Sequence, residues 1–208
     1  MPDEKNDTAE LSNLYQQYYH EDGVAPAVLA SFRIFAGVLV RRYSPKRVID
    51  FGCSGGALVR AMAELGVSAI GIDGSKHALD RTPGKIFQHD LRCKSGIPWE
   101  PASFDMATTT DTAEHIEPEY AETFSGLVAG AVAPGGVVAF GGAPPGQGGV
   151  HHVNCRRVFY WIDMLERHGL KLLAADTESV RDEIERDPAH ATCWWVQQNV
   201  MMLRKVAP

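Results

Sequence analysis

The feature that most constrains the fold is a glycine-rich turn between a short apolar run and an amphipathic segment. Residues 47–51 read RVIDF, residues 52–56 read GCSGG, and residues 57–66 read ALVRAMAELG. Glycines between a strand and a helix let the backbone turn sharply and let a ligand approach the helix N-terminus. The pattern therefore predicts a strand, a ligand-facing turn and a helix, which is the first unit of a doubly wound α/β sheet.

The alternation of strand and helix patterns continues to the end of the chain. Further strands are expected at 68–73, 85–90, 103–110, 136–142, 170–176 and 192–205, and further helices at 75–80, 118–133 and 156–169. Two helices are expected before the turn, over residues 11–20 and 27–43, and the first places three tyrosines on one face. We predict one α/β domain over residues 45–208 whose helices cover both faces of a parallel sheet, preceded by a helical lid over residues 1–44.

Charge and composition exclude several classes of protein. The chain has 20 Lys and Arg against 26 Asp and Glu, a net charge of −6, which argues against a protein that binds bare nucleic acid. The opening MPDEKNDTAE is no signal peptide, and no apolar run approaches the ~18 residues of a membrane helix. Four cysteines are scattered without a CxxC pair, which is typical of a reducing compartment. We expect a cytoplasmic monomer or homodimer that binds a small molecule and no membrane.

Two carboxylates follow the predicted strand ends. Asp50 lies near the end of the first strand, where it could accept hydrogen bonds from an ammonium or amide group. Asp73 ends the second strand, 21 residues after Gly52, which is the usual place for a carboxylate that binds a ribose diol. The structural alternative is a tight turn with solvated carboxylates, but such turns in doubly wound sheets normally face a ligand.

These motifs resemble those of the class I S-adenosylmethionine (SAM)-dependent methyltransferases. Residues 50–56, DFGCSGG, are similar to the acid and GxGxG that form the family's first motif, with Ser54 where the middle glycine is common. GID at 71–73 matches the segment with the ribose acid, and HDL at 89–91 matches the segment that contacts adenine.

The resemblance continues downstream and covers roughly residues 45–205. SFD at 103–105 and AEHI at 113–116 look like the fourth strand and the SAM-facing segment after it, and PGG at 134–136 precedes the expected fifth strand. The resemblance implies a Rossmann-like sheet of seven strands, mostly parallel, with the last strand antiparallel. It assigns cofactor contacts to Asp50, Gly52, Cys53, Ser54, Gly55, Asp73, Gly74, Asp90, Leu91, Asp111 and Glu114.

A narrower likeness concerns the acceptor side. HHVN at 151–154, YW at 160–161 and HG at 168–169 resemble an HVN…YW…GF pattern of bacterial methyltransferases that act in sugar and natural-product pathways. Leu170 replaces the aromatic residue of that pattern. The N-terminal helix is similar to the lid of these enzymes. The implied substrate contacts are Tyr15, Tyr18, Tyr19 and Asn154.

Three histidines are candidates for a catalytic base. His151 and His152 stand in a Gly-rich loop after the predicted fifth strand, at the edge of the sheet where ligands bind. Imidazole titrates near neutral pH, so either could take a proton from a substrate hydroxyl, or one could simply fasten the loop. His115, in the segment that resembles a wall of the SAM pocket, is a further candidate. Spacing alone does not choose among them.

A metal site is the rival use of these side chains. His151, His152 and Cys155 are near neighbours, and Asp111 could join them. However, adjacent residues of an extended loop point to opposite sides, and Mg²⁺ sites need several oxygen ligands. We therefore expect no metal. Trp194 and Trp195 are expected to alternate across the last strand, and no chemistry is assigned to them.

The function predicted is SAM-dependent methyl transfer to a small molecule, with a hydroxyl oxygen of a sugar or natural-product intermediate as the favoured acceptor. An amine acceptor remains an alternative. An NAD(P)-dependent oxidoreductase would share the glycine turn and the ribose acid, but its GxGxxG fingerprint is replaced here by GxxGG. A non-catalytic SAM- or nucleotide-binding module is the other alternative.

Overall fold

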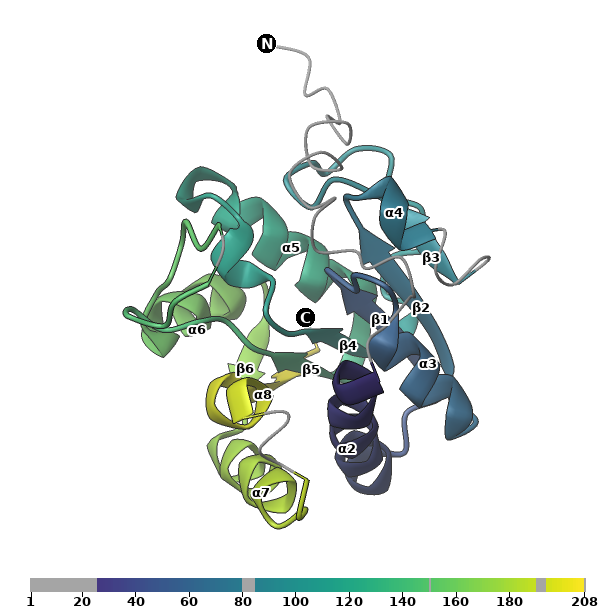
Figure 1. Ribbon diagram of the computed structural model, residues 1–208. Coiled ribbons are helices and arrows are strands. Elements are labelled where there is room, and N and C mark those ends of the chain that lie inside the picture. Colours follow the sequence, from purple (N-terminus) through teal and green to yellow (C-terminus); the bar gives the residue numbers. More distant parts are fainter. Residues whose placement is uncertain (1–25, 80–84, 150, 190–193, 208) are drawn as a thin grey trace, which may run out of the picture.

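The computed structural model describes residues 26–79, 85–149, 151–189 and 194–207 (Figure 1). The helix predicted over residues 11–20, with Tyr15, Tyr18 and Tyr19, lies outside these ranges. The division between a lid and a main domain at residue 44 therefore stays a prediction. Within the described ranges, no helix combines the length and the apolar character needed to span a bilayer.

The described strands form one seven-stranded sheet in the order β3-β2-β1-β4-β5-β7-β6. Their bounds are β1 Arg47–Phe51, β2 Ser68–Asp73, β3 Ile86–Gln88, β4 Phe104–Thr109, β5 Val132–Phe140, β6 Leu170–Leu172 and β7 Met201–Lys205. The first five strands pair in parallel, and β7 runs antiparallel to both β5 and β6. This confirms the predicted mixed sheet with a reversed last strand. The strand order reverses between β1 and β4, and ligands of such sheets bind at the carboxyl ends beside this point.

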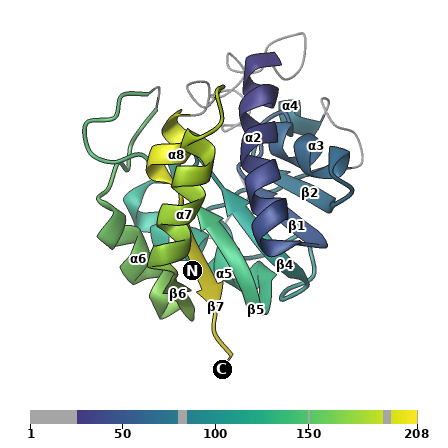
Figure 2. The same ribbon diagram turned by 90° about the horizontal axis from the view of Figure 1, so that it is seen from below.

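Helices cover both faces of the sheet (Figures 1 and 2). Their bounds are α2 Pro26–Tyr43, α3 Ala57–Glu64, α4 Lys76–Leu79, α5 Ala121–Ala131, α6 Val158–Arg167, α7 Ala174–Glu185 and α8 Trp194–Asn199, with 3-10 turns η2 Ala113–His115 and η3 Pro118–Tyr120. One core cluster includes residues of α2, α3, α7 and α8, and the other includes residues of α5 and α6. Alternate side chains of a strand serve opposite faces, so β4 sends Met106 into the first cluster and Ala107 into the second.

Helix α2 confirms the helix predicted over residues 27–43. Phe35 and Leu39 of this helix are fully buried in the first core cluster. Figure 2 shows α2 beside α7, and Arg42 pairs with Glu183 of that helix at 2.5 Å. Contacts with α7 and with the core make α2 an integral part of the layer on this face of the sheet.

The strand predicted over residues 170–176 is mostly wrong. Strand β6 ends at Leu172, and helix α7 follows over Ala174–Glu185. Thr177, Val180 and Ile184 are the buried residues of α7, and their spacing of three and four residues is the period of an amphipathic helix. That period outweighs the strand-like start of the segment.

The long strand predicted over residues 192–205 is also wrong in its first part. Residues Trp194–Asn199 form helix α8, and only Met201–Lys205 pair in the sheet. Trp194 and Trp195 therefore do not alternate across a strand. The pairing of β7 with β5 begins at Met201 opposite Phe140, so no strand partner faces the tryptophans.

The fifth strand begins earlier than predicted. Helix α5 ends at Ala131 and β5 begins at Val132, so Pro134, Gly135 and Gly136 lie inside the strand instead of before it. The pairing of β4 with β5 is irregular between Phe104 and Met106. Phe104 pairs with Val132 and Met106 pairs with Val137, so β5 contains more residues than β4 in this stretch. Gly135 has a φ of 85°, which a glycine adopts without strain.

Candidate active site

A cavity of about 490 Å³ lies at the carboxyl ends of β1 to β4. Its volume is within the usual range for a small-molecule site. Many of the predicted site residues line it, namely Gly52, Ser54, Asp73, Gly74, Asp90, Leu91, Asp111, His115 and His152. These residues are far apart in the sequence, and the parallel strands bring them to one edge of the sheet.

The glycine turn forms one wall of the cavity and is tied to the neighbouring strand. The backbone N–H groups of Gly52 and Cys53 both donate to the carbonyl of Ile72, at 2.8 and 3.1 Å. Gly52 has a φ of 70°, and a Cβ atom there would collide with the side chain of Thr112. Position 52 therefore requires glycine for its conformation and for its close neighbour.

Asp73 is fixed at the end of β2 by the turns on either side. Its Oδ2 accepts from the N–H of Ser54 at 2.9 Å, and its Oδ1 accepts from the N–H of Ser75 at 2.8 Å. A carboxylate has about four acceptor positions in all, so one carboxylate can bind backbone N–H groups and a ligand's hydroxyl groups at the same time. The same carboxylate thus shapes the turn and faces the cavity.

Asp90 follows β3 and is paired with a cation. The guanidinium of Arg92 contacts both carboxylate oxygens, with Nη2 2.9 Å from Oδ2 and Nε 3.0 Å from Oδ1. Arg92 also lies 3.4 Å from Glu117, and all three residues line the cavity. One guanidinium therefore pairs with two carboxylates at this end of the cavity, so Asp90 is not a bare acid.

Other predicted residues lie behind the cavity wall. Cys53 fills the space above Gly71, where a Cβ atom would collide with its sulfur. Asn154 is buried and accepts a hydrogen bond from Arg156 Nε at 2.7 Å. Gly55, Glu114 and His151 do not line the cavity either. Their predicted contacts with cofactor or substrate stay predictions.

Asp50 is buried in the centre of the sheet. It accepts a 2.7 Å hydrogen bond from the hydroxyl of Thr108, and it does not line the cavity. Burial raises the pKa of Asp50 from 3.8 to about 7, against the opposing effect of Thr108. The nearby charge of Asp73 also raises it. The fold therefore favours the protonated carboxyl group.

This preference predicts a pH-dependent gain of stability in Asp50→Asn. The stability that the protonated acid contributes is fully present below about pH 4 and is lost as the pH rises through about 7. Asparagine resembles the protonated acid and loses nothing in this window. We expect the variant to melt at a higher temperature than wild type at pH 8 and at an equal temperature near pH 4. Thermal denaturation across this range, with the exposed Asp163→Asn as control, measures the difference; an equal melting temperature at pH 8 contradicts it.

The loop over residues 141–154 is fastened to η2 and carries two of the candidate histidines. The N–H groups of Val153 and Asn154 both donate to the carbonyl of Glu114, each at 2.9 Å. His115 Nδ1 lies 3.1 Å from the carbonyl oxygen of His151. A carbonyl can only accept, so Nδ1 carries the proton and Nε2 carries the lone pair of the neutral ring. These contacts hold the ring of His115 against the loop.

His115 and His152 meet at the cavity. Their rings are 4.9 Å apart and nearly perpendicular. Burial lowers the pKa of His115, which favours the neutral ring. A Cβ atom at Gly149 would collide with the ring of His152, so glycine at this position leaves space for the ring.

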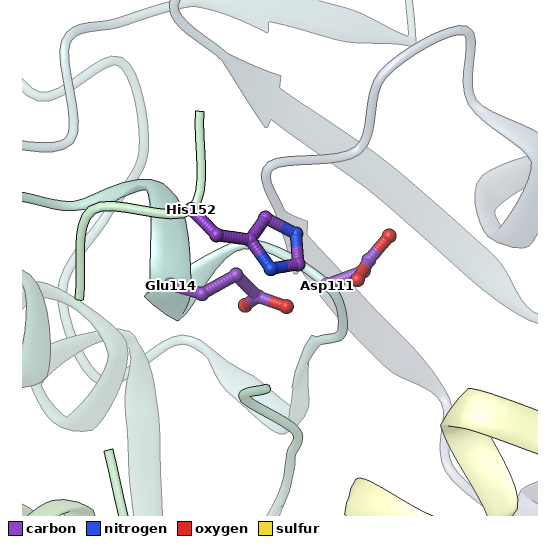
Figure 3. A group of neighbouring side chains, drawn as sticks. All are labelled: Asp111, Glu114 and His152. Carbon is purple, nitrogen blue, oxygen red and sulfur yellow. The ribbon is translucent and has the colours of Figure 1, made fainter. Parts of the chain in front are cut away.

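Two carboxyl groups lie beside these rings (Figure 3). Glu114 is fully buried, and burial followed by the charge of Asp111 raises its pKa to about 8. Asp111 is exposed and has a φ of 56°, a left-handed conformation that non-glycine residues adopt rarely. In Figure 3 the side chains of His152 and Glu114 extend toward Asp111, and one oxygen or nitrogen atom of each residue lies within 4.8 Å of those of the other two.

The sequence argument missed several residues of the cavity. Trp194 and Trp195 of α8 line it, with ring centroids 6.1 Å apart and planes nearly perpendicular. Gln147 lines it from the loop and accepts a 3.0 Å hydrogen bond from Asn199 Nδ2. The adjacent pair of tryptophans was the available signal, but the strand assignment placed the two rings on opposite sides of the sheet.

A family model described as a methyltransferase domain matches residues 26–141, more than half of the chain. The curated relatives include a ubiquinone biosynthesis O-methyltransferase of Paraburkholderia phymatum, 37% identical over 78 residues, which are 34% of each chain. Another of the same name, from Paracidovorax citrulli, is 35% identical over 103 residues, covering 46% of this chain and 42% of the relative. The chain thus matches less than half the length of these relatives.

Solved structures share the fold. A SAM-dependent methyltransferase from Archaeoglobus fulgidus has a TM-score of 0.60 at 16% identity, covering 92% of this chain and all of that one. Phosphoethanolamine N-methyltransferase 2 of Haemonchus contortus, bound to phosphomonomethylethanolamine and S-adenosylhomocysteine, has a TM-score of 0.57 at 16% identity and covers 98% of this chain and 58% of that one. The cyclase SpnF has a TM-score of 0.58 at 14% identity, covering 85% and 82%. A fold shared with an enzyme named a cyclase does not by itself identify the chemistry.

Proposed function

The chain belongs to the methyltransferase domain family, and we propose that it transfers a methyl group from SAM to a hydroxyl oxygen of a small molecule. The observation that carries the proposal is the anchored carboxylate of Asp73 beside the Gly52 turn, at the cavity where the strand order reverses. The names of the curated relatives support oxygen as the acceptor. A sugar or natural-product intermediate is the acceptor that we favour.

The residues that line the cavity fit SAM. Asp73 offers carboxylate oxygens to the ribose hydroxyl groups, and the turn at Gly52 and Ser54 brings backbone to the cavity wall, where a ligand can contact it. Leu91 supplies an apolar surface at the end where Asp90 is paired with Arg92, which suits the adenine ring. When bound, SAM supplies a methyl group already activated on a sulfonium sulfur. The residues therefore have to align the acceptor and manage one proton.

His115 is the residue that we propose as the base. It lines the cavity, and its hydrogen bond to His151 O turns the lone pair of Nε2 away from the loop. His115 would accept the proton of the acceptor hydroxyl while the oxygen forms its bond to the methyl carbon and the carbon–sulfur bond breaks. The electron pair of that bond stays on sulfur, which leaves as the neutral thioether of S-adenosylhomocysteine. Charge and atoms balance, with the proton held on the imidazole.

The tryptophan pair of α8 supports an acceptor with an apolar ring or face. Trp194 and Trp195 line the same cavity as His115 and His152. Large aromatic side chains bind planar or apolar surfaces, and indole N–H groups can donate to oxygen atoms at the edge. An acceptor amine would need less help from a base than a hydroxyl, so methylation of nitrogen remains the second candidate. The predicted lid with Tyr15, Tyr18 and Tyr19 would close over the acceptor.

Binding of S-adenosylhomocysteine should stabilise this protein, and NADH should not. A ligand at 100 times its dissociation constant adds about 2.7 kcal/mol to the free energy of unfolding. The turn reads GxxGG and does not match the GxGxxG fingerprint of a dinucleotide site. NADH, which also contains adenosine, therefore serves as the matched control. Thermal denaturation with each ligand measures the effect. No shift with either SAM or S-adenosylhomocysteine would contradict the assignment, and binding without turnover on any acceptor would favour a non-catalytic module.

A further inference from the structure

Three side chains of metal-binding type converge at the wall of the cavity. Asp111 follows β4, Glu114 lies on η2, and His152 comes from the loop over residues 141–154 (Figure 3). One possible ligand atom from each residue lies within 4.8 Å of those of the other two. The group therefore brings together two parts of the chain that are 38 residues apart.

Glu114 points to a ligand independently of this grouping. Its side chain is 0% exposed, and neither carboxylate oxygen has a partner at ordinary hydrogen-bond geometry within the part of the chain that the structure describes. Weaker interactions with the backbone of Glu114 and Ala143 lower its pKa, but they do not offset burial and the charge of Asp111. Figure 3 shows its carboxylate directed at His152 and Asp111. Burial of a carboxylate without a partner is costly, and buried charges are normally paired or bind a metal. The nearest charged side chain in the group is Asp111, whose negative charge makes the burial less favourable.

We propose that Asp111, Glu114 and His152 bind one divalent transition-metal ion of the Mn²⁺ or Zn²⁺ class. Two carboxylates balance the charge of such an ion, and an imidazole ligand favours it over Mg²⁺ or Ca²⁺, which prefer oxygen. This set differs from the one considered from the sequence, His151, His152 and Cys155 with Asp111, because the fold places Glu114 beside Asp111 and His152. The objection that adjacent histidines point apart does not apply to it.

Small side-chain movements would complete the site. Metal–ligand distances of about 2.0–2.2 Å place two ligand atoms of one ion roughly 3–4 Å apart. The possible ligand atoms of the three residues lie within 4.8 Å of one another, which is slightly more than that separation. Asp111 is exposed, so its side chain can rotate to close the difference, whereas Glu114 is held by the backbone contacts of Val153 and Asn154 to its carbonyl.

The ion would have open positions that face the cavity. Asp111 and His152 line the cavity, and three protein ligands leave room for water or for another oxygen ligand, as in catalytic metal sites. We infer that the open position takes the hydroxyl oxygen of the acceptor and lowers its pKa. This role rests on the proposed function, but binding of the ion itself does not.

The test is a titration of the 208-residue chain with Mn²⁺ after treatment with EDTA and desalting. The electron paramagnetic resonance signal of free Mn²⁺ gives the number of sites and their affinity. We expect one saturable site per chain, displaced by Zn²⁺ and not by an equal concentration of Mg²⁺. Asp111→Asn, Glu114→Gln and His152→Gln should each weaken binding by more than about tenfold. Glu119→Gln, an exposed acid on η3, is the matched control and should bind as wild type does.

Several outcomes would overturn the proposal. Absence of a saturable site would mean that these three side chains bind no ion, and binding that survives all three substitutions would place the metal elsewhere. Equal displacement by Mg²⁺ would overturn the assignment to transition metals. If Glu114→Gln does not fold, the exposed Asp111→Asn carries the test. Failure of S-adenosylhomocysteine to bind while Mn²⁺ binds would remove the proposed function and leave the metal site intact.

Discussion

Replacement of His115 by alanine should lower the turnover of methyl transfer about 10²–10⁴-fold, the range typical of a lost general base. SAM affinity should change little, because the contacts proposed for ribose and adenine, Asp73 and Leu91, come from the end of β2 and from the segment after β3 and not from η2. Steady-state release of S-adenosylhomocysteine measures turnover, and calorimetric titration with SAM measures affinity. His168→Ala removes an imidazole from the far end of α6, where His168 pairs with Glu122 at 2.9 Å, and should leave both quantities unchanged.

A comparison with His152→Ala separates the two histidines at the cavity. Removal of a metal ligand and removal of a base both lower turnover. Only removal of the metal ligand also abolishes Mn²⁺ binding. Near-normal turnover of His115→Ala, together with a loss of turnover in His152→Ala that leaves Mn²⁺ binding intact, would move the base to His152. Near-normal turnover in both variants would contradict the need for a base and would favour an amine acceptor.

The parallel half of the sheet could be predicted from local pattern alone. Strands β1 and β2 have the predicted bounds, because RVIDF and SAIGID are apolar runs flanked by turn residues. Such runs are buried on both faces and have no competing helical period. The carboxyl ends of parallel strands share one edge, so the positions of Gly52, Asp73 and Asp90 at a common cavity followed from the sequence order.

The C-terminal part could not be predicted in the same way. The segment at 192–205 is largely apolar and aromatic, which is the composition typical of a strand. Among its described residues, however, the sheet offers pairing partners only to the last ones. Tertiary contacts decided the structure there: Val196 of α8 packs into the core beside α7. Which histidine faces the cavity depended in turn on the docking of the loop over residues 141–154 onto Glu114, a contact between backbones that leaves no side-chain pattern.

Asp73→Ala should raise the dissociation constant of SAM about 10- to 150-fold, and it should also lower the melting temperature. The loss of charged hydrogen bonds to the ribose costs about 1.5–3 kcal/mol, which corresponds to that range of affinity. The melting temperature falls because the N–H groups of Ser54 and Ser75 lose their acceptor. A loss of affinity could then arise indirectly from a loosened turn, so the experiment needs a control that damages stability alone.

Asp105 provides that control within the same chain. Its two carboxylate oxygens accept from the N–H groups of Lys46 and Arg47 at 2.8 and 3.0 Å, which is the bonding pattern of Asp73, but it lies at the start of β4, at the edge of the sheet opposite the cavity. Asp105→Ala should therefore lower the melting temperature and leave SAM affinity as in wild type. If Asp73→Ala and Asp105→Ala reduce affinity equally, general destabilisation explains the effect. If only Asp73→Ala reduces it, general destabilisation does not explain the effect, because each variant loses two backbone hydrogen bonds of the same kind.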